Sequence, residues 1–234
     1  MPDDLPERVS IREVGPRDGF QNEPEVIATD DKVRLVEMLA RTGVKRLEVT
    51  SFVRADVIPQ LADGAEVLRR ADIPGDVSVS VLIPNERGFD RALELRDDID
   101  EVNVFLSASE THNRKNVNRS IEESLQGLER VLPRAREAGL RCEGVISVSF
   151  GCPYEGEVPP ERVFAIAERL AAAGATGNIA TEDLVSMLHE MGIETGVDLE
   201  RLLDAAHAVR DVLGRPLGSH TLVAGPVDWH GSAA

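Results

Sequence analysis

Apolar and polar positions follow two alternating periods along the first 175 residues of the chain. Short β-branched runs recur roughly every 30 residues, and stretches with apolar residues at helical spacing lie between them. The runs predict five strands: Val9–Val14, Arg46–Ser51, Val77–Ile83, Glu101–Ser107 and Arg141–Phe150. The stretches between and after them predict helices from Thr29, around Leu61–Arg70, near Phe89–Arg96, after Ser120, and from about Pro160 to Ala173.

Capping signals mark two of these helices. Thr29 precedes apolar residues at helical spacing, and we expect it to cap the first helix. Ser120 and Glu123 have the spacing of a capping box, which predicts where the long fourth helix begins.

Repeated strand–helix units of this length predict parallel strands joined by right-handed crossovers. The fold class is therefore α/β, and the unit-by-unit repetition favours a (β/α) TIM-type barrel, with an open two-sided sheet as the alternative. The rhythm stops after Ala173, where Thr181–Met191 and Asp198–Leu213 predict two successive helices without a strand between them. The tail 215–234 is predicted to be flexible.

Composition narrows the function classes. The 42% of hydrophobic residues suffice for one core, which must be aliphatic because aromatic residues make up only 3%. A net charge of −16 argues against binding to nucleic acid or to an anionic membrane. Two cysteines form no disulfide framework, and no apolar run approaches the ~18 residues that span a bilayer. The acidic start has no signal-peptide core, so a cytoplasmic protein is expected.

Ligands of parallel βα proteins bind beyond the carboxyl ends of the strands, where this chain places polar loops. These loops are Gly15–Asn22, Thr50–Val53, Pro84–Asn85, Ser107–Asn116 and Gly151–Gly156. Arg17 and Asp18 lie between two glycines in the first loop, where the carboxylate could hold a divalent cation and the arginine polarise a carbonyl oxygen. The alternative is an ion pair in a surface turn. Glu48 either points inward, where it needs a cation or donor, or faces a helix arginine on the outside.

Basic and thiol groups give weaker signals. Arg114, Lys115 and Arg119 precede a helix start and suit a phosphate, such as those of a nucleotide-bearing thioester, unless they are only a solvated helix start. Cys142 is expected in the core, and Cys152 is the better candidate for a reactive thiol. The histidines form no His-x-His pair.

Seven segments can be compared together with known families: Gly15–Glu23, Glu48–Val53, Pro59–Gln60, Lys115–Asn118, Ser120–Ser124, Gly151–Gly156 and Gly177–Leu184. In combination they resemble the hydroxymethylglutaryl-CoA lyase family, in the metal-dependent TIM-barrel lyase superfamily. The resemblance covers nearly the whole chain. It implies divalent-metal-dependent cleavage of a carbon–carbon bond in 3-hydroxy-3-methylglutaryl-CoA, giving acetyl-CoA and acetoacetate, a reaction of leucine degradation.

The resemblance also implies roles for individual residues. Asp18 and Asn178 match metal ligands, for Mg²⁺ or Mn²⁺, and Arg17 matches the arginine that stabilises charge on the thioester oxygen. Glu48 matches an acidic residue of the active-site network, so Arg17 and Glu48 are the expected catalytic residues. Arg17, Gln21, Arg114 and Lys115 are the expected substrate-binding residues.

One departure from the family is large. Members carry three more strand units before the Gly-Asn-x-Ala-Thr-Glu-Asp segment, including a His-x-His metal pair and a loop cysteine, whereas here Ala175 runs directly into Thr176. Residues 1–234 are therefore expected to form a single lyase-type domain that lacks roughly three βα units between about 175 and 176. Its cation should be weakly held, and its open sheet edges could support a homo-oligomer. Two interpretations follow: a lyase with impaired activity, or a catalytically silent protein that binds CoA or an intact paralogue.

Overall fold

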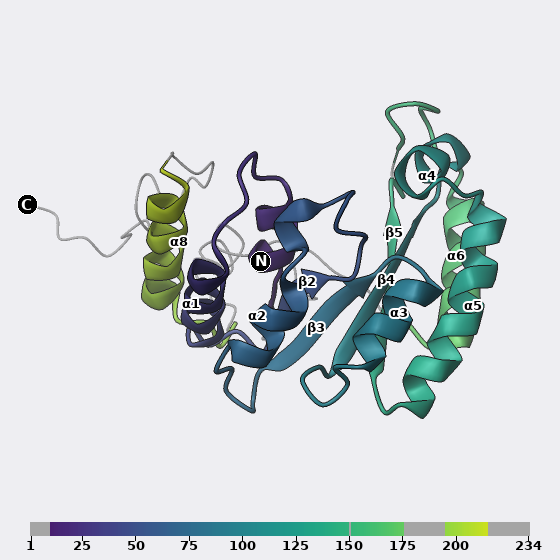
Figure 1. Cartoon of the computed structure of the whole chain (residues 1–234). Helices are drawn as coiled ribbons and strands as arrows, with labels where there is room; N and C mark the ends of the chain where they lie inside the picture. Colours follow the sequence, from purple (N-terminus) through teal and green to yellow (C-terminus); the bar gives the residue numbers. More distant parts are fainter. Residues whose placement is uncertain (1–9, 150, 176–194, 215–234) are drawn as a thin grey trace, which may run out of the picture. The chain divides into compact units, whose positions relative to one another are not determined.

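The computed structural model describes residues 10–149, 151–175 and 195–214 (Figure 1). The chain divides into two compact units. Unit 1 comprises Met1–Val49, Glu66–Val77 and Ile179–Ala234, and unit 2 comprises Thr50–Ala65 and Ser78–Asn178. Each unit is described by itself.

Unit 1 is built on a short parallel strand pair. Strand β1 (Arg12–Glu13) pairs with β2 (Arg46–Ser51), with Arg12 opposite Arg46 and Glu13 opposite Leu47. A single helical turn, η1 (Gly15–Gly19), follows β1 directly. The helices of this part of the chain are α1 (Thr29–Ala40), α2 (Gly64–Arg70) and α8 (Leu199–Leu213).

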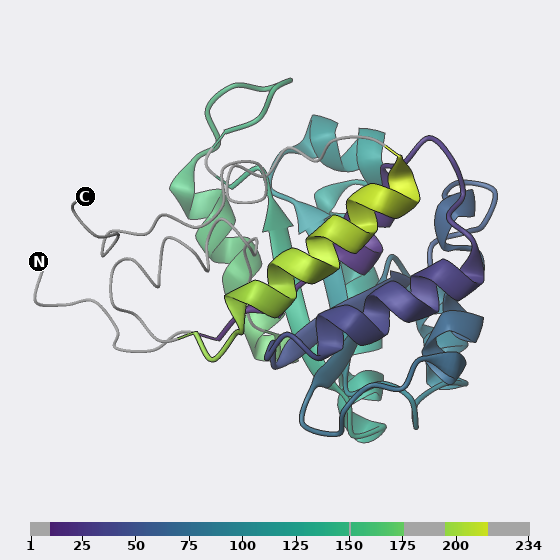
Figure 2. The same ribbon diagram turned by 90° about the vertical axis from the view of Figure 1, so that its left-hand side faces the viewer.

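Helix α8 packs along α1 although the two are far apart in sequence (Figure 2). Asp198 caps α8 by accepting a hydrogen bond from the backbone N–H of Arg201 at 3.1 Å. The Arg201 guanidinium donates to the carbonyl oxygen of Arg41 at 3.1 Å. Gly43 has a φ of 98° and lies against the Gly196 carbonyl, so no residue with a Cβ fits there without a shift. The C-terminal helix is thus anchored to the start of the chain.

Unit 2 contains three adjacent parallel strands. They are β3 (Ser78–Ile83), β4 (Glu101–Ser107) and β5 (Arg141–Ser147), and β4 pairs with both of the others. The helices are α3 (Glu86–Leu93), α4 (Glu110–Val117), α5 (Ile121–Glu137) and α6 (Pro160–Ala173), with a short turn η2 (Pro59–Leu61) before α2. Side chains such as Val81, Val104 and Leu132 are fully buried. The core is aliphatic, as the composition predicts.

A buried amide fixes the connection from β4 to α5. The Asn113 side chain is fully buried and accepts a hydrogen bond from the Ser107 backbone N–H at 2.9 Å. Its amide nitrogen donates to the carbonyl oxygens of Arg119 and Ser120 and to Ser124 Oγ. This network holds α4 against the end of β4.

Most predicted elements are confirmed, with local corrections. β2, β4 and α6 have the predicted bounds, and Ser120 and Glu123 form the predicted capping box at the start of α5. Thr29 is not the cap of α1, because Ala28 occupies that position and makes no side-chain cap. The segment expected as a polar loop from Ser107 contains α4 instead, since Ser109 accepts from the His112 N–H and starts a helix.

Several predictions fall outside the described residues. They concern a helix over Thr181–Met191, a flexible tail over 215–234, and the ligand Asn178. Within the described ranges, no helix has the length and apolar character needed to cross a bilayer.

The buried thiol of Cys142 predicts a loss of stability in alkali. Burial raises the pKa of Cys142 to about 11, against 9.0 for an ordinary thiol. Because the folded state holds the thiol proton more tightly than the unfolded state does, the thiol contributes fully to the free energy of unfolding below pH 9. This contribution is lost as the pH rises toward 11. We expect the melting temperature to fall by a few degrees over that interval, and to fall less for Cys142→Ala relative to its own value at pH 8. Parallel pH dependences of the two proteins would contradict this.

Candidate functional site

A buried guanidinium–carboxylate cluster lies at the carboxyl end of β1 in unit 1. Glu48 on β2 is fully buried, and one of its oxygens accepts a hydrogen bond from Nε of Arg17. Nη1 of Arg17 donates to Asp18 Oδ1 at 2.5 Å. Arg12 on β1 places Nη1 4.0 Å from the other Glu48 oxygen. Arg17 is therefore held between two carboxylates in a fixed orientation.

Local backbone geometry brings Arg17 to this position. The chain turns directly after β1, and the backbone N–H groups of Arg17 and Asp18 donate to the Val14 carbonyl oxygen at 3.0 and 2.7 Å. The Gly15 N–H donates to Glu13 Oε1 at 2.5 Å. A Cβ at Gly15 would lie 2.7 Å from that oxygen, so glycine allows the Glu13 carboxylate to close the turn.

The Asp18 carboxylate already has protein donors. Its Oδ1 accepts from Arg17 and also from Gln21 Nε2 at 2.9 Å, and its side chain is 52% exposed. Asn22 donates to the Asp18 backbone oxygen at 2.6 Å. Asp18 and Gln21 are thus joined in one hydrogen-bonded group around Arg17.

The donor set described in the structure does not fit a divalent cation. Mg²⁺ or Mn²⁺ takes about six ligands, mostly oxygens. In the described ranges, no group of three or more His, Cys, Asp or Glu side chains is arranged to hold a metal ion. Of the two expected ligands, Asp18 is engaged by Arg17 and Gln21, and Asn178 lies outside the described residues.

Both sequence alternatives for this region can now be compared with the geometry. Glu48 is fully buried, and its carboxylate is bound by Arg17 of the turn after β1 and lies near Arg12 of β1. Arg17 and Asp18 form the ion pair of the other alternative, in the turn after β1, and Arg17, whose side chain is 14% exposed, also binds Glu48. The metal role of Asp18 stays a prediction.

The described part of unit 2 has a second polar group where β4 and β5 end. Cys152 is buried, its Sγ lies 3.0 Å from Ser109 Oγ, and the Tyr154 N–H donates to it at 3.3 Å. Burial opposes ionisation of this thiol, but its hydrogen bond with Ser109 and those from the backbone of Tyr154 and Glu155 together outweigh burial, so the pKa of Cys152 is lowered. A thiol that is hydrogen-bonded and buried is positioned structurally, and its reactivity stays a prediction.

Helix α4 carries the two cations predicted to bind phosphate. Arg114 pairs with Glu110 at 2.8 Å, and Lys115 Nζ lies 4.1 Å from the centre of the Tyr154 ring. Both are in the last turn of α4, before the start of α5. Their role in binding a substrate stays a prediction.

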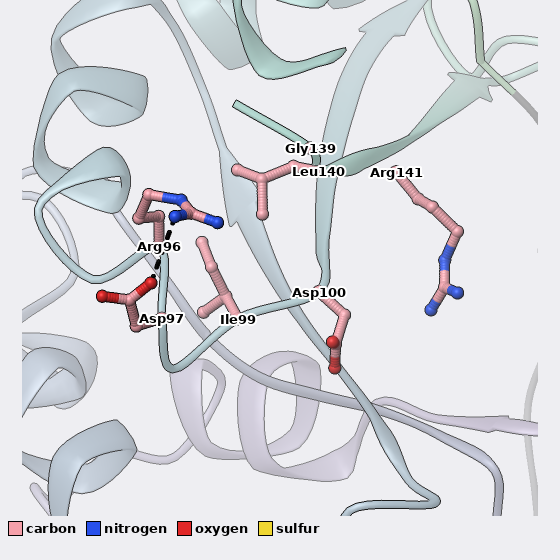
Figure 3. A pocket seen from close by; sticks show the side chains of 7 residues that line it. All are labelled: Arg96, Asp97, Ile99, Asp100, Gly139, Leu140 and Arg141. Carbon is pink, nitrogen blue, oxygen red and sulfur yellow. Dashed lines mark ion pairs between the residues drawn. The ribbon is translucent and has the colours of Figure 1, made fainter. Parts of the chain in front are cut away.

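A hollow of about 320 Å³ lies at the opposite end of β4 and β5 (Figure 3). Arg96 pairs with Asp97 at 3.2 Å, and Arg141 pairs with Glu101 at 3.0 Å. The two cations that line the hollow, Arg96 and Arg141, therefore both have carboxylate partners. It is at the amino ends of the strands, where TIM-type folds place stabilising rather than catalytic residues.

Sequence reasoning missed Arg12 and Glu13. Both are buried, at 3% and 6% exposure, and they make contacts that shape the Arg17 cluster. Two charged residues between the apolar Ile11 and Val14 are unusual in a strand. That pattern was the available signal, because buried charges need partners.

Comparisons with known proteins identify what this chain resembles. It matches the family model described as HMGL-like over residues 8–176. It is 36% identical to a hydroxymethylglutaryl-CoA lyase of Bacillus subtilis, over 93% of this chain and 97% of the relative. It is 35% identical to the cytoplasmic 3-hydroxy-3-methylglutaryl-CoA lyase of Danio rerio, over 92% and 86%.

Solved structures of HMG-CoA lyases are also similar to this chain. The HMG-CoA lyase of Bacillus subtilis has a TM-score of 0.89 at 36% identity, covering 94% of this chain and 98% of that one. An HMG-CoA lyase from Acinetobacter baumannii, in complex with coenzyme A and 3-methylmalate, has a TM-score of 0.85 at 28% identity over 94% and 95%. These likenesses confirm the predicted fold class, an incomplete TIM-type barrel with about five parallel strands followed by C-terminal helices.

The alignments also contain positions that no residue of this chain fills. The alignment with the Bacillus subtilis relative has 292 positions, whereas 93% of 234 residues is about 218 residues, so about 74 positions face no residue here. The family-model match ends at residue 176.

Proposed function

Because this chain belongs to the HMGL-like family, a family of carbon–carbon lyases, we propose that it binds 3-hydroxy-3-methylglutaryl-CoA as the lyases do but cleaves it slowly. The observation that carries the proposal is the position of Arg17, which binds the buried carboxylate of Glu48 and the carboxylate of Asp18. A coenzyme A complex of the Acinetobacter baumannii relative supports an acyl-CoA ligand.

The chemistry assigned to this cluster is charge stabilisation. Cleavage next to a thioester develops negative charge on the thioester oxygen, and a guanidinium fixed before the reaction stabilises that charge without reorganising. Arg17 is the proposed donor to this oxygen. Glu48 acts through Arg17 by fixing its orientation, and Gln21 orients the Asp18 carboxylate.

Metal binding is proposed to be weak. Among the described residues, Asp18 is the one member of the expected ligand set, and it is already bound to Arg17 and Gln21. A Mg²⁺ or Mn²⁺ ion would need to displace these donors or share the carboxylate with them.

The gap in the alignments supports the proposal that one domain of residues 1–234 lacks roughly three βα units near 175–176. About 74 absent positions correspond to between two and three units of ~30 residues. A match ending at residue 176 supports the same position. Relatives include cytoplasmic and mitochondrial lyases, and we propose a cytoplasmic location for this chain.

The proposal is tested by two measurements on the purified chain. Calorimetric titration with CoA should give saturable binding, and an acetoacetate assay with Mg²⁺ or Mn²⁺ should give slow turnover. Binding without any turnover favours the second interpretation, a catalytically silent CoA-binding protein. Absence of binding contradicts the proposal.

Removal of the α4 cations is expected to weaken CoA binding. Arg114→Gln combined with Lys115→Gln should raise the Kd for CoA about tenfold at low salt and flatten its salt dependence, because screened charge attraction is lost. The matched control is Arg41→Gln with Lys45→Gln, which removes two exposed cations of unit 1 that pair with Asp72 and Asp76. Equal Kd values for the two double variants, measured by calorimetry, would remove Arg114 and Lys115 from the binding site.

A further inference from the structure

We propose that Tyr154 is a positioning residue for ligand binding in unit 2. The loop Gly151–Gly156, here called the 151–156 loop, binds α4, and through Tyr154 it orients the Lys115 ammonium toward a phosphate of CoA. This role rests on the proposed binding of CoA and extends it to a loop that the proposed chemistry leaves unused. The loop lies beside α4, after the carboxyl end of β5 (Figure 1).

Helix α4 has little apolar packing of its own. Its eight residues, Glu110–Val117, are almost entirely polar, and the buried residue among them is Asn113. Helical segments shorter than ~12 residues are marginal in water unless tertiary contacts stabilise them. The orientation of α4, and with it the orientation of its cations, therefore depends on polar contacts with neighbouring segments.

The 151–156 loop is closed on itself and bonded to the first turn of α4. Cys152 and Gly156 exchange two backbone hydrogen bonds, at 2.7 and 2.8 Å. Glu155 Oε1 accepts a hydrogen bond from the backbone N–H of Thr111 at 2.6 Å. Cys152 Sγ lies 3.0 Å from the Oγ of Ser109, the residue that caps α4. Two side chains of the loop thus attach it to the start of the helix.

The Tyr154 ring contacts the last turn of the same helix. Lys115 Nζ lies 4.1 Å from the centre of the ring, which is within the range of a cation–π contact. The ring of His112, about one helical turn earlier, lies 6.0 Å from the Tyr154 ring between centroids. The backbone N–H of Tyr154 donates to Cys152 Sγ at 3.3 Å, which joins the ring to the attached end of the loop.

An aromatic face orients an ammonium group without neutralising its charge. Lysine is a compact charge on a flexible stem, and ordering a flexible side chain on binding costs affinity. The neighbouring cation, Arg114, pairs with the Glu110 carboxylate at 2.8 Å, which offsets its charge. Lys115 against the Tyr154 ring keeps its full charge and is ordered before binding. We therefore expect Lys115 to bind a phosphate more strongly than Arg114 does.

A spectroscopic test uses the low lysine content of the chain, since its lysines are Lys32, Lys45 and Lys115. Reductive methylation with ¹³C-formaldehyde labels lysine side chains and keeps their charge. The methyl signals of Lys115 should lie upfield of those of Lys45, because the ring current of Tyr154 shields them. Tyr154→Leu should remove this shift, Tyr154→Phe should keep it, and Lys115→Arg assigns the signal. An unshifted Lys115 signal in the otherwise unmodified chain overturns the proposal.

Calorimetric titration with CoA tests the consequence for binding. Tyr154→Leu should raise the Kd for CoA about two- to fivefold at low salt, as expected for an exposed cation–π contact, and Tyr154→Phe should restore it. The matched control, Phe164→Leu, replaces an aromatic residue of α6 that is 65% exposed and should leave the Kd unchanged. In a chain that carries Lys115→Gln, Tyr154→Leu should have no further effect, because its role acts through Lys115. Thermal melts check that each variant folds.

The outcomes separate this role from the proposed function. If the chain does not bind CoA, the proposed function is contradicted, and the methyl signals alone decide whether Tyr154 orients Lys115. If the chain binds CoA but Tyr154→Leu leaves the Kd unchanged, the positioning role is overturned and the proposed function stands. Independent effects of Tyr154→Leu and Lys115→Gln on the Kd would also overturn the role, because Tyr154 would then contact the ligand directly.

Discussion

The purified chain is expected to release acetoacetate from 3-hydroxy-3-methylglutaryl-CoA at least ~10³-fold more slowly than the intact Bacillus subtilis relative, in the same assay with Mg²⁺ or Mn²⁺. Family resemblance assigns the cation two histidine ligands and the proton transfer a loop cysteine. The sequence contains no His-x-His pair, and Cys152 lies in the loop Gly151–Gly156, before the position at which the family's loop cysteine is expected to be missing. Loss of a proton-transfer group alone costs about 10²–10⁴-fold.

The losses are not expected to multiply in full, because groups that act as one catalytic unit show strongly non-additive effects. Arg17 and its carboxylates are retained, and a fixed donor to a developing oxyanion preserves part of the stabilisation. Residual turnover should therefore depend on Arg17. Arg17→Ala should abolish whatever turnover remains, and because it also removes a partner of the buried Glu48, its thermal melt is measured alongside to verify that it folds.

The intact relative assayed in parallel is the control for substrate and metal quality. Turnover close to that of the relative would refute this expectation. Substitution of His220 and His230 by alanine would then show whether these histidines of the C-terminal segment replace the missing pair.

The fold was largely predictable because parallel βα units repeat a simple pattern. The first and last residues of β2, β4 and α6 follow directly from apolar runs and their flanking residues. Helix α4 could not be predicted from the sequence, because its residues are almost entirely polar. Only the Ser109 cap and the buried Asn113 indicate an ordered helix there. The spacing of apolar residues does not predict a helix that is stabilised by one buried amide.

The sequence singles out Arg17, Asp18 and Glu48 of the candidate site but not the contacts among them. The glycines around Arg17 and the charged Glu48 within an apolar strand mark the two elements, yet only the fold shows that they meet. The burial of Arg12 and Glu13 was not predicted, because two adjacent charged residues are ordinarily exposed to solvent. Their burial depends on partners that lie far away in sequence, such as Glu48.

The same contacts imply that Glu48 is a structural necessity as well as a positioning residue. Its carboxylate is fully buried beside two arginines, of which Arg12 is itself only 3% exposed. Removing one partner of a buried ion pair leaves a buried charge without compensation, which typically costs about 3–5 kcal/mol. An exposed pair such as Lys45 with Asp76 lacks this penalty, because water solvates the remaining partner.

Glu48→Ala is accordingly expected to destabilise the protein by about 3–5 kcal/mol and to lower its melting temperature by roughly 6–20 °C. Glu48→Gln should lose less, because the amide oxygen still accepts a hydrogen bond from Arg17. Asp76→Ala, the exposed control, should melt at nearly the temperature of the unmodified protein. Thermal and urea unfolding of the three variants measure this order. If Glu48→Ala melted with the Asp76→Ala control, the Glu48 carboxylate would contribute no more than a solvated surface pair, and its buried contacts with Arg17 and Arg12 could not be what holds the turn after β1 in place.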